Sequence, residues 1–177
     1  MISQRMQDEM NEQIKHETFS AYLYFSMAAY FHAKSLDGMA QWMKAQAQEE
    51  LDHALRFFNH IDGRGGRIEL QAIEKPQTLW ESPLAAFEAA LVHEEFITGR
   101  INELVKIAAE ENDNAAAIML QWFVSEQVEE EASVTKVVDM LKLIGDFGHG
   151  LLMADRELGQ RVAGPVTGGT ANSQAQA

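Results

Sequence analysis

Cysteine is absent from the sequence, positive charge is scarce, and long uninterrupted apolar runs do not occur. The absence of cysteine excludes disulfides, thiolate zinc sites and cysteine-held iron–sulfur centres. Only 14 Lys and Arg residues stand against 27 Asp and Glu residues, and the net charge of −13 disfavours contact with the phosphate backbone of nucleic acid. No apolar run approaches the roughly 18 residues of a membrane-spanning helix, and residues 1–12 lack the apolar core of a signal peptide. We therefore expect a soluble, cytoplasmic protein that binds neither nucleic acid nor membrane.

Four long segments space their apolar residues three and four positions apart, which is typical of helices that face a core. The sequence predicts helices over about residues 4–34, 38–62, 83–111 and 114–144, with a short fifth helix within 146–158. The candidate N-caps are Ser3, Asp37, Ser82 and Asn114, and glycines at positions 63 and 145 are typical helix ends.

Residues 64–81 lack helical spacing and contain Pro76, so they are expected to form a long loop. About 18 extended residues reach up to roughly 60 Å, which exceeds the roughly 38 Å length of a 25-residue helix. The loop can therefore run along the whole bundle and start the third helix parallel to the second. This topology predicts an all-α four-helix bundle with one long crossover between helices 2 and 3.

Each of the four apolar patterns is interrupted by polar residues near its midpoint. A buried carboxylate is unfavourable unless it is paired, so interruptions at the same level are expected to meet inside the bundle. The alternative, surface carboxylates on misphased helices, would require the same error in four independent patterns. The interrupting residues are Glu17, Glu50, His53, Glu94, Gln127 and Glu130.

This set of side chains predicts a metal site. Glu50 and His53 share one helical face because they are three residues apart, as do Gln127 and Glu130. Four carboxylates carry four negative charges, which about two divalent cations would neutralise. Carboxylate oxygens with one imidazole suit Fe(II), Mn(II) or Zn(II).

The motifs around these positions resemble those of the non-haem bacterial ferritins, over about residues 5–160. They are Glu17 with Tyr24, the stretch Gln-Glu-Glu-Leu-Asp-His at 48–53, His-Glu-Glu at 93–95, and Ser-Glu-Gln-Val-Glu-Glu-Glu at 125–131. The resemblance implies a ferritin-like di-iron domain over residues 1–160 with a short C-terminal fifth helix. We expect a disordered tail over 161–177, which is rich in small and polar residues.

The resemblance also implies a ferroxidase centre with two irons. The first iron would be held by Glu17, Glu50 and His53. The second would be held by Glu50 as a bridge, by Glu94 and by Glu130. Gln127 would lie beside the second iron, either as a ligand or as a core amide that hydrogen-bonds a neighbour.

A third iron position is implied on the inner side of the bundle, formed by Glu49, Glu126, Glu129 and Glu130. The alternative for Glu49, Glu126 and Glu129 is that they only form a solvated acidic face. Tyr24 would hydrogen-bond to the centre and could donate an electron, or could be only a packed aromatic residue.

Bacterioferritins, the nearest relatives to exclude, have Glu and His where Gln127 and Glu130 stand here. Their haem-ligating Met follows the helix-two Glu, where this chain has Leu51, so we expect no haem. Animal ferritins line three-fold channels with acids near the start of the fourth helix. Residues 115–120 here are Ala-Ala-Ala-Ile-Met-Leu, so that channel is not expected.

Together these features predict iron storage and detoxification by a ferroxidase. Fe(II) would be oxidised by O2 or H2O2, and ferric mineral would be deposited inside a hollow homo-oligomeric shell of 24 subunits. One alternative is a non-storing di-iron oxidase or peroxidase of the same bundle fold. Another is a structural helical bundle that takes up no metal.

Overall fold

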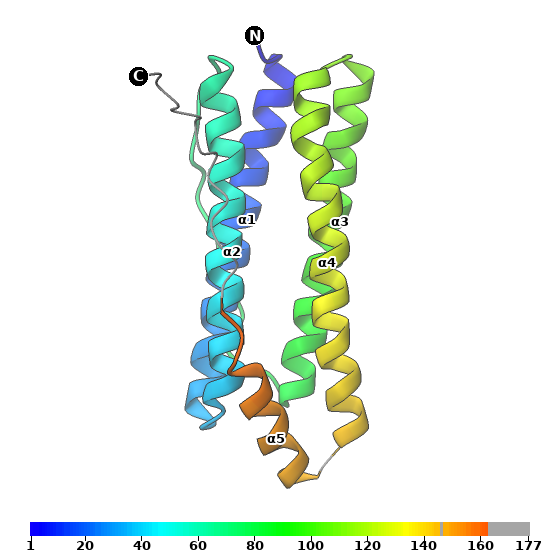
Figure 1. Cartoon of the computed structure of the whole chain (residues 1–177). Helices are drawn as coiled ribbons and strands as arrows, with labels where there is room; N and C mark the ends of the chain where they lie inside the picture. Colours follow the sequence, from blue (N-terminus) through cyan, green and yellow to red (C-terminus); the bar gives the residue numbers. More distant parts are fainter. Residues whose placement is uncertain (146, 163–177) are drawn as a thin grey trace, which may run out of the picture.

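The structure is a computed structural model, and it describes residues 1–145 and 147–162. Four long helices lie side by side, and a short fifth helix folds across one end of the bundle (Figure 1). No strand occurs in the described residues, so the predicted all-α four-helix bundle is confirmed. The helices are α1 (Gln4–Ala33), α2 (Asp37–Gly63), α3 (Pro83–Glu110), α4 (Asn114–Ile144) and α5 (Gly148–Leu158).

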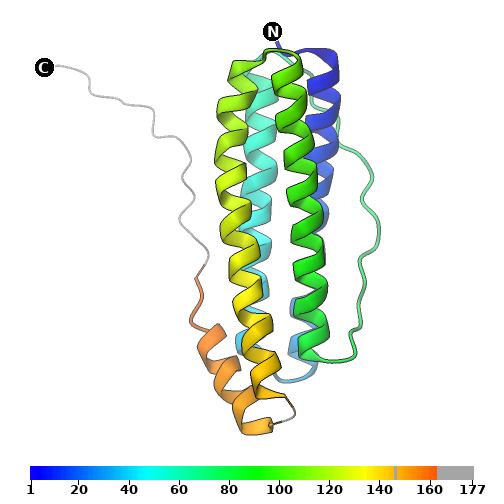
Figure 2. The ribbon, with the colours of Figure 1, turned by 90° about the vertical axis from the view of Figure 1, so that its right-hand side faces the viewer.

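The segment between α2 and α3 runs the length of the bundle, as its predicted reach requires (Figure 2). Helices α2 and α3 therefore point in the same direction, as expected. Asn11 of α1 holds the beginning of this segment at two points. Its amide nitrogen donates to the Arg67 carbonyl over 3.0 Å, and its amide oxygen accepts from the Glu69 backbone nitrogen over 3.0 Å.

Two of the four expected N-caps are correct. Ser3 accepts a hydrogen bond from the Met6 backbone nitrogen, and Ser82 accepts one from that of Ala85. For α4 the cap is Asp113, whose carboxylate accepts from the Ala116 backbone nitrogen over 3.0 Å. The expectation of Asn114 was wrong because that residue is already inside the first turn.

The N-terminus of α2 is capped by a residue from another helix. Asp37 is the first helical residue rather than the cap, and the cap position, Leu36, has no side chain that can accept. Instead, the Met39 backbone nitrogen donates to Asp155 of α5 over 2.8 Å. The approach is close enough to require glycine, since a Cβ at Gly38 would lie 1.6 Å from the Asp155 carbonyl oxygen. This contact fixes α5 to the end of the bundle.

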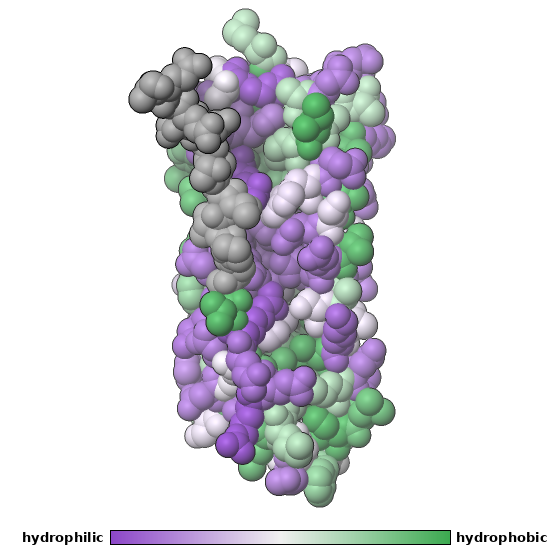
Figure 3. All heavy atoms as spheres, in the orientation of Figure 1, coloured by the Kyte–Doolittle hydropathy of each residue, from purple (hydrophilic) through white to green (hydrophobic). Residues whose placement is uncertain are grey.

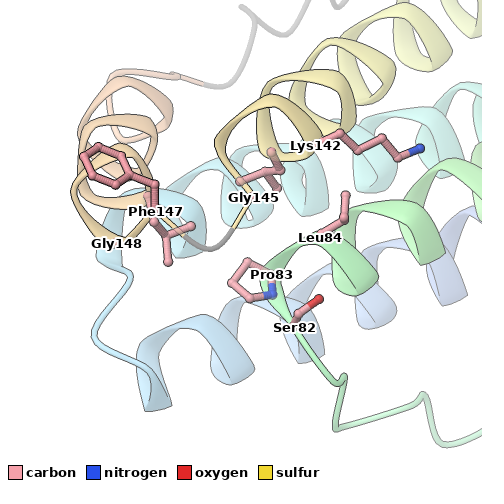
Figure 4. Close-up of a pocket in the computed structure, with 9 residues that line it drawn as sticks. Ser82, Pro83, Leu84, Lys142, Gly145, Phe147 and Gly148 are labelled. Atoms are coloured by element: carbon pink, nitrogen blue, oxygen red, sulfur yellow. The ribbon is translucent and has the colours of Figure 1, made fainter.

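The turn between α4 and α5 leaves a pocket against the start of α3 (Figure 4). It is lined mainly by apolar groups, among them Pro83, Leu84 and Phe147. Exposed apolar side chains also gather at this end of the molecule, whereas the middle of the face formed by α2 and α4 is mostly hydrophilic (Figure 3). None of the described helices is both long and apolar enough to cross a membrane.

The apolar core is divided into two clusters. The cluster at the α5 end of the bundle includes Phe31, Met43 and Phe87. The cluster at the opposite end includes Phe57 and Phe123, whose rings stack with centroids 4.3 Å apart. We call them the α5-end cluster and the N-terminal cluster. A layer of buried polar side chains lies between them.

The predicted division into a domain over 1–160 and a tail over 161–177 stays a prediction. Of that tail, residues 161 and 162 are described, whereas 163–177 lie outside the described residues.

Candidate metal centre

The polar layer contains all six residues that interrupt the apolar patterns, and every one of the four long helices contributes. Each is at most 4% exposed, so the interruptions do point into the bundle rather than to solvent. The six are Glu17 on α1, Glu50 and His53 on α2, Glu94 on α3, and Gln127 and Glu130 on α4.

Three of these residues form a compact group with the dimensions of a metal site. The ligand atoms of Glu17, Glu50 and His53 all lie within 4.8 Å of one another. His53 Nδ1 is 3.4 Å from a Glu50 oxygen and 4.0 Å from a Glu17 oxygen. Two ligands that are each about 2.1 Å from one metal ion lie up to about 4.2 Å apart, so these separations suit a shared ion.

Two buried carboxylate oxygens in this group have no hydrogen-bond donor among residues 1–145 and 147–162. Glu17 Oε2 and Glu50 Oε1 are buried, and no partner for either is found among the residues that the structure describes. Buried polar atoms are otherwise almost always hydrogen-bonded, and an unpaired carboxylate oxygen is the atom that a cation would bind. The residues present therefore fit a hard metal ion.

Glu94 is held differently, by hydrogen-bond donors. The Tyr24 hydroxyl donates to Glu94 Oε1, and the Gln127 amide nitrogen lies 3.3 Å from Glu94 Oε2 and donates to it. The same amide also lies 3.3 Å from the Thr98 hydroxyl. Tyr24 and Gln127 thus both donate to Glu94, a predicted ligand of the second iron, and the two alternatives for Gln127 stay predictions.

Burial and mutual repulsion dominate the electrostatics of the layer. Burial, together with the Glu50 charge, raises the pKa of Glu17 to about 8. Burial also raises the pKa of Glu50, with repulsion from Glu94 and Glu130 adding to the effect. Burial likewise raises the pKa of both Glu94 and Glu130. Carboxyl groups with raised pKa values would release protons on binding a cation.

The structure also identifies two amides that the sequence analysis did not single out. The Gln13 amide nitrogen donates to Glu17 over 2.8 Å, and that of Gln46 donates to Glu130. Each of these glutamines lies one turn before a predicted ligand, Glu17 or Glu50, on the same helical face. A glutamine one turn before a predicted ligand was therefore the sequence feature that could have identified these two residues.

The four residues of the predicted third position lie together in the structure. Glu49, Glu126, Glu129 and Glu130 line one pocket between α2 and α4. This pocket adjoins the buried layer, because ligand atoms of His53, Glu126 and Glu130 all lie within 4.8 Å of one another. Burial raises the pKa of Glu126, although this residue is only partly covered.

Comparison with known proteins finds similar sequences of one family. The sequence model of the ferritin family, described as a ferritin-like domain, matches residues 7–144. A bacterial non-heme ferritin of Bacteroides fragilis (strain 638R) is 43% identical over 161 residues, covering 91% of this chain and 100% of the relative. A bacterial non-heme ferritin of Campylobacter jejuni is 40% identical over 156 residues, covering 88% of this chain and 93% of the relative.

Solved structures show the same likeness. An open pore ferritin from the hyperthermophilic archaeon Archaeoglobus fulgidus superposes with a TM-score of 0.90 at 50% identity, covering 91% of this chain and 99% of that one. A humanized archaeal ferritin superposes with a TM-score of 0.92 at 51% identity, covering 93% of this chain and 100% of that one.

Proposed function

The chain belongs to the ferritin family, whose members store iron and oxidise Fe(II), and we propose that oxidation here takes place at the buried polar layer. The observation that carries the proposal is the compact group of Glu17, Glu50 and His53, with two buried carboxylate oxygens that lack a donor among the described residues. These three residues would hold one Fe(II). Glu50 would bridge to a second Fe(II) held by Glu94 and Glu130.

The protein supplies position, charge and proton release. Each of two Fe(II) ions gives up one electron, and O2 with two protons accepts both electrons to become hydrogen peroxide. Because burial raises the pKa of Glu17 and its neighbours, these carboxyls release protons when the cations bind. Gln13 and Gln46 orient carboxylates through hydrogen bonds. Tyr24 and Gln127 do the same for Glu94.

Several finer features form part of the same proposal. Glu49, Glu126 and Glu129, with Glu130, would form a third iron position on the way to the stored mineral. The site would contain no haem, because Leu51 offers no ligand for haem iron. The subunits would assemble into a 24-subunit shell with α5 at the four-fold axes, located in the cytoplasm.

Iron loading combined with size measurement tests the proposal. The purified protein is given Fe(II) in air, far in excess of three ions per subunit, and then separated by gel filtration with iron and protein detection. We expect iron to co-elute with a particle of several hundred kDa at many ions per subunit. Saturation at two or three ions per subunit on a small species would instead support the non-storing di-iron oxidase or peroxidase.

A matched pair of variants ties the iron to the layer. Glu50→Gln removes one buried carboxylate, whereas Glu95→Gln removes an exposed carboxylate next to Glu94. We expect only the first variant to lose rapid Fe(II) oxidation. Equal oxidation rates for both variants would contradict this assignment of the site.

A further inference from the structure

Arg161 lies beside the acidic pocket between α2 and α4. Its guanidinium Nη2 is 2.6 Å from Glu49 Oε2, and its Cζ atom lies 4.4 Å from the centre of the Trp42 ring. Its side chain is only 20% exposed, which is low for an arginine. The residue is thus held by both charge and stacking.

The docking of α5 places Arg161 there. Asp155 accepts the hydrogen bond from Met39 at the start of α2, and Leu158 at the end of α5 is buried. A Cβ at Gly159 would lie 3.0 Å from Gly38 Cα, so the backbone leaving α5 presses against α2. The Arg161 backbone nitrogen then donates to the Leu158 carbonyl over 3.2 Å. The backbone at Arg161 is therefore held in place against α2.

The guanidinium faces the residues of the proposed third iron position. Arg161 lines the same pocket as Glu49, Glu126, Glu129 and Glu130, and Lys136 is the other basic residue of its lining. One of the Arg161 nitrogens, Nη1, is buried and has no hydrogen-bond partner in the described part of the chain. Burial raises the pKa of Glu130, and the positive charge of Arg161 offsets a small part of that rise. A positive group thus already lies among the carboxylates that would bind a third cation.

We infer that Arg161 is a built-in counter-cation of the third metal position, and that a metal ion must displace its guanidinium in order to bind there. The inference rests on the proposed third position. A guanidinium and a divalent ion repel each other a few ångströms apart, and they compete for the same carboxylates. Arg161 would therefore keep this position weak and favour the onward movement of iron over its retention, without affecting the first ion at Glu17, Glu50 and His53.

Zinc binding to the full-length assembly tests this directly, because Zn(II) is redox-silent and its uptake does not depend on turnover. Binding isotherms of the metal-free protein are compared with those of Arg161→Gln, Arg161→Lys and Arg67→Gln. Arg67 is a charge control, with a side chain that is 81% exposed and paired with Glu69. We expect two tighter ions and one weaker ion per subunit, with the weaker one bound about tenfold more tightly by Arg161→Gln alone.

The outcomes distinguish failure of the inference from failure of the proposed function. Arg161→Lys, which keeps the charge, should stay close to the unmodified protein, and gel filtration should show an unchanged particle size for all variants. Equal affinity for the weaker ion in Arg161→Gln and the unmodified protein would overturn the inference, but it would not contradict the proposed third position. The same tightening in Arg67→Gln would also overturn it. Binding of only two ions by every variant would remove the third position and the inference together, whereas no tight binding at all would overturn the dinuclear centre too.

Discussion

The buried polar layer and the two apolar clusters that flank it are built on the same four helices, yet they contribute to the free energy of unfolding with opposite signs. In the N-terminal cluster, Phe57 and Phe123 are fully buried and stacked, so they stabilise the fold by leaving water. In the layer, Glu17 and Glu50 are equally buried but keep oxygens without a donor in the described chain. Burial without full hydrogen bonding is destabilising.

This difference shows how the bundle tolerates a reactive site. The clusters at the two ends stabilise the helices on both sides of the layer, so the middle need not be stable by itself. Cations that bind the layer only in the folded state raise the free energy of unfolding of the protein. Mutations in the clusters are therefore expected to lower the free energy of unfolding, and mutations in the layer are expected to weaken metal binding and oxidation.

The largest expected effect is on the function of the layer. Glu50→Gln removes the carboxylate proposed to bridge both ions, so Fe(II) oxidation should fall by at least the roughly 10–100-fold that is typical when a residue supporting a metal ligand is mutated. The metal-free protein should be equally stable or more stable, since a buried carboxylate is removed. Oxidation rates and melting curves of the metal-free protein measure the two effects. A marked loss of metal-free stability would contradict the comparison.

The next effect is on stability in a flanking cluster. Phe57→Ala should lower the free energy of unfolding by about 3–5 kcal/mol, because it removes a buried ring and leaves a cavity. The number of tightly bound Zn(II) ions per subunit should not change. Denaturation of the metal-free protein and zinc titration test both statements. Phe58→Ala, at a partly buried neighbouring position, should destabilise less; equal losses at the two positions would contradict the cavity argument.

The fold and most of the layer could be predicted from the sequence because both depend on periodicity. A core-facing stripe is visible in one helix at a time, and so is a carboxylate that interrupts it, such as Glu17 or Glu94. The crossover could be predicted because only a long loop can start α3 beside the start of α2.

Contacts between helices could not be predicted in the same way. The partner of Gln46 is Glu130, and the cap of α2 is Asp155, 116 residues beyond the Met39 nitrogen that donates to it. Such pairings depend on how helices pack, which periodicity does not specify. Arg161 was missed for a further reason: it begins a segment whose composition favours disorder, although its own side chain contacts Glu49.

A smaller effect is expected when the pH is changed. The pKa of Glu17 is about 8 in the folded protein against an ordinary value of 4.5, so between these values the folded state binds more protons than the unfolded state. Stability then falls as pH rises, and the contribution is lost as the pH passes through about 8. The melting temperature of the metal-free protein should therefore be lower near pH 8.5 than near pH 6.

Zinc-loaded protein provides the contrast for this measurement. Bound cations keep the carboxylates deprotonated, so zinc should raise the melting temperature more at the higher pH. Glu17→Gln should weaken the pH dependence of the metal-free protein. A metal-free melting temperature that rises across the same pH range, beyond what the variant shows, would contradict the assigned shift.

The smallest expected effect concerns a residue that belongs to both regions. The ring of Tyr24 packs in the α5-end cluster, while its hydroxyl donates a hydrogen bond to Glu94 in the layer. Tyr24→Phe keeps the ring and removes the donor, so it should change the free energy of unfolding by only about 1 kcal/mol and leave zinc stoichiometry unchanged. Fe(II) oxidation should slow by about two- to tenfold, because Glu94 loses the donor that orients it.

Tyr22→Phe is the matched control, since this neighbouring hydroxyl belongs to a residue that is 46% exposed. Rapid-mixing measurements of Fe(II) oxidation on both variants separate the two roles of Tyr24. An unchanged rate in Tyr24→Phe would assign the residue to the apolar cluster alone, as a packed aromatic. A slower rate with unchanged zinc stoichiometry would show that the boundary between the two regions passes through a single side chain, with the ring contributing stability and the hydroxyl acting on the metal centre.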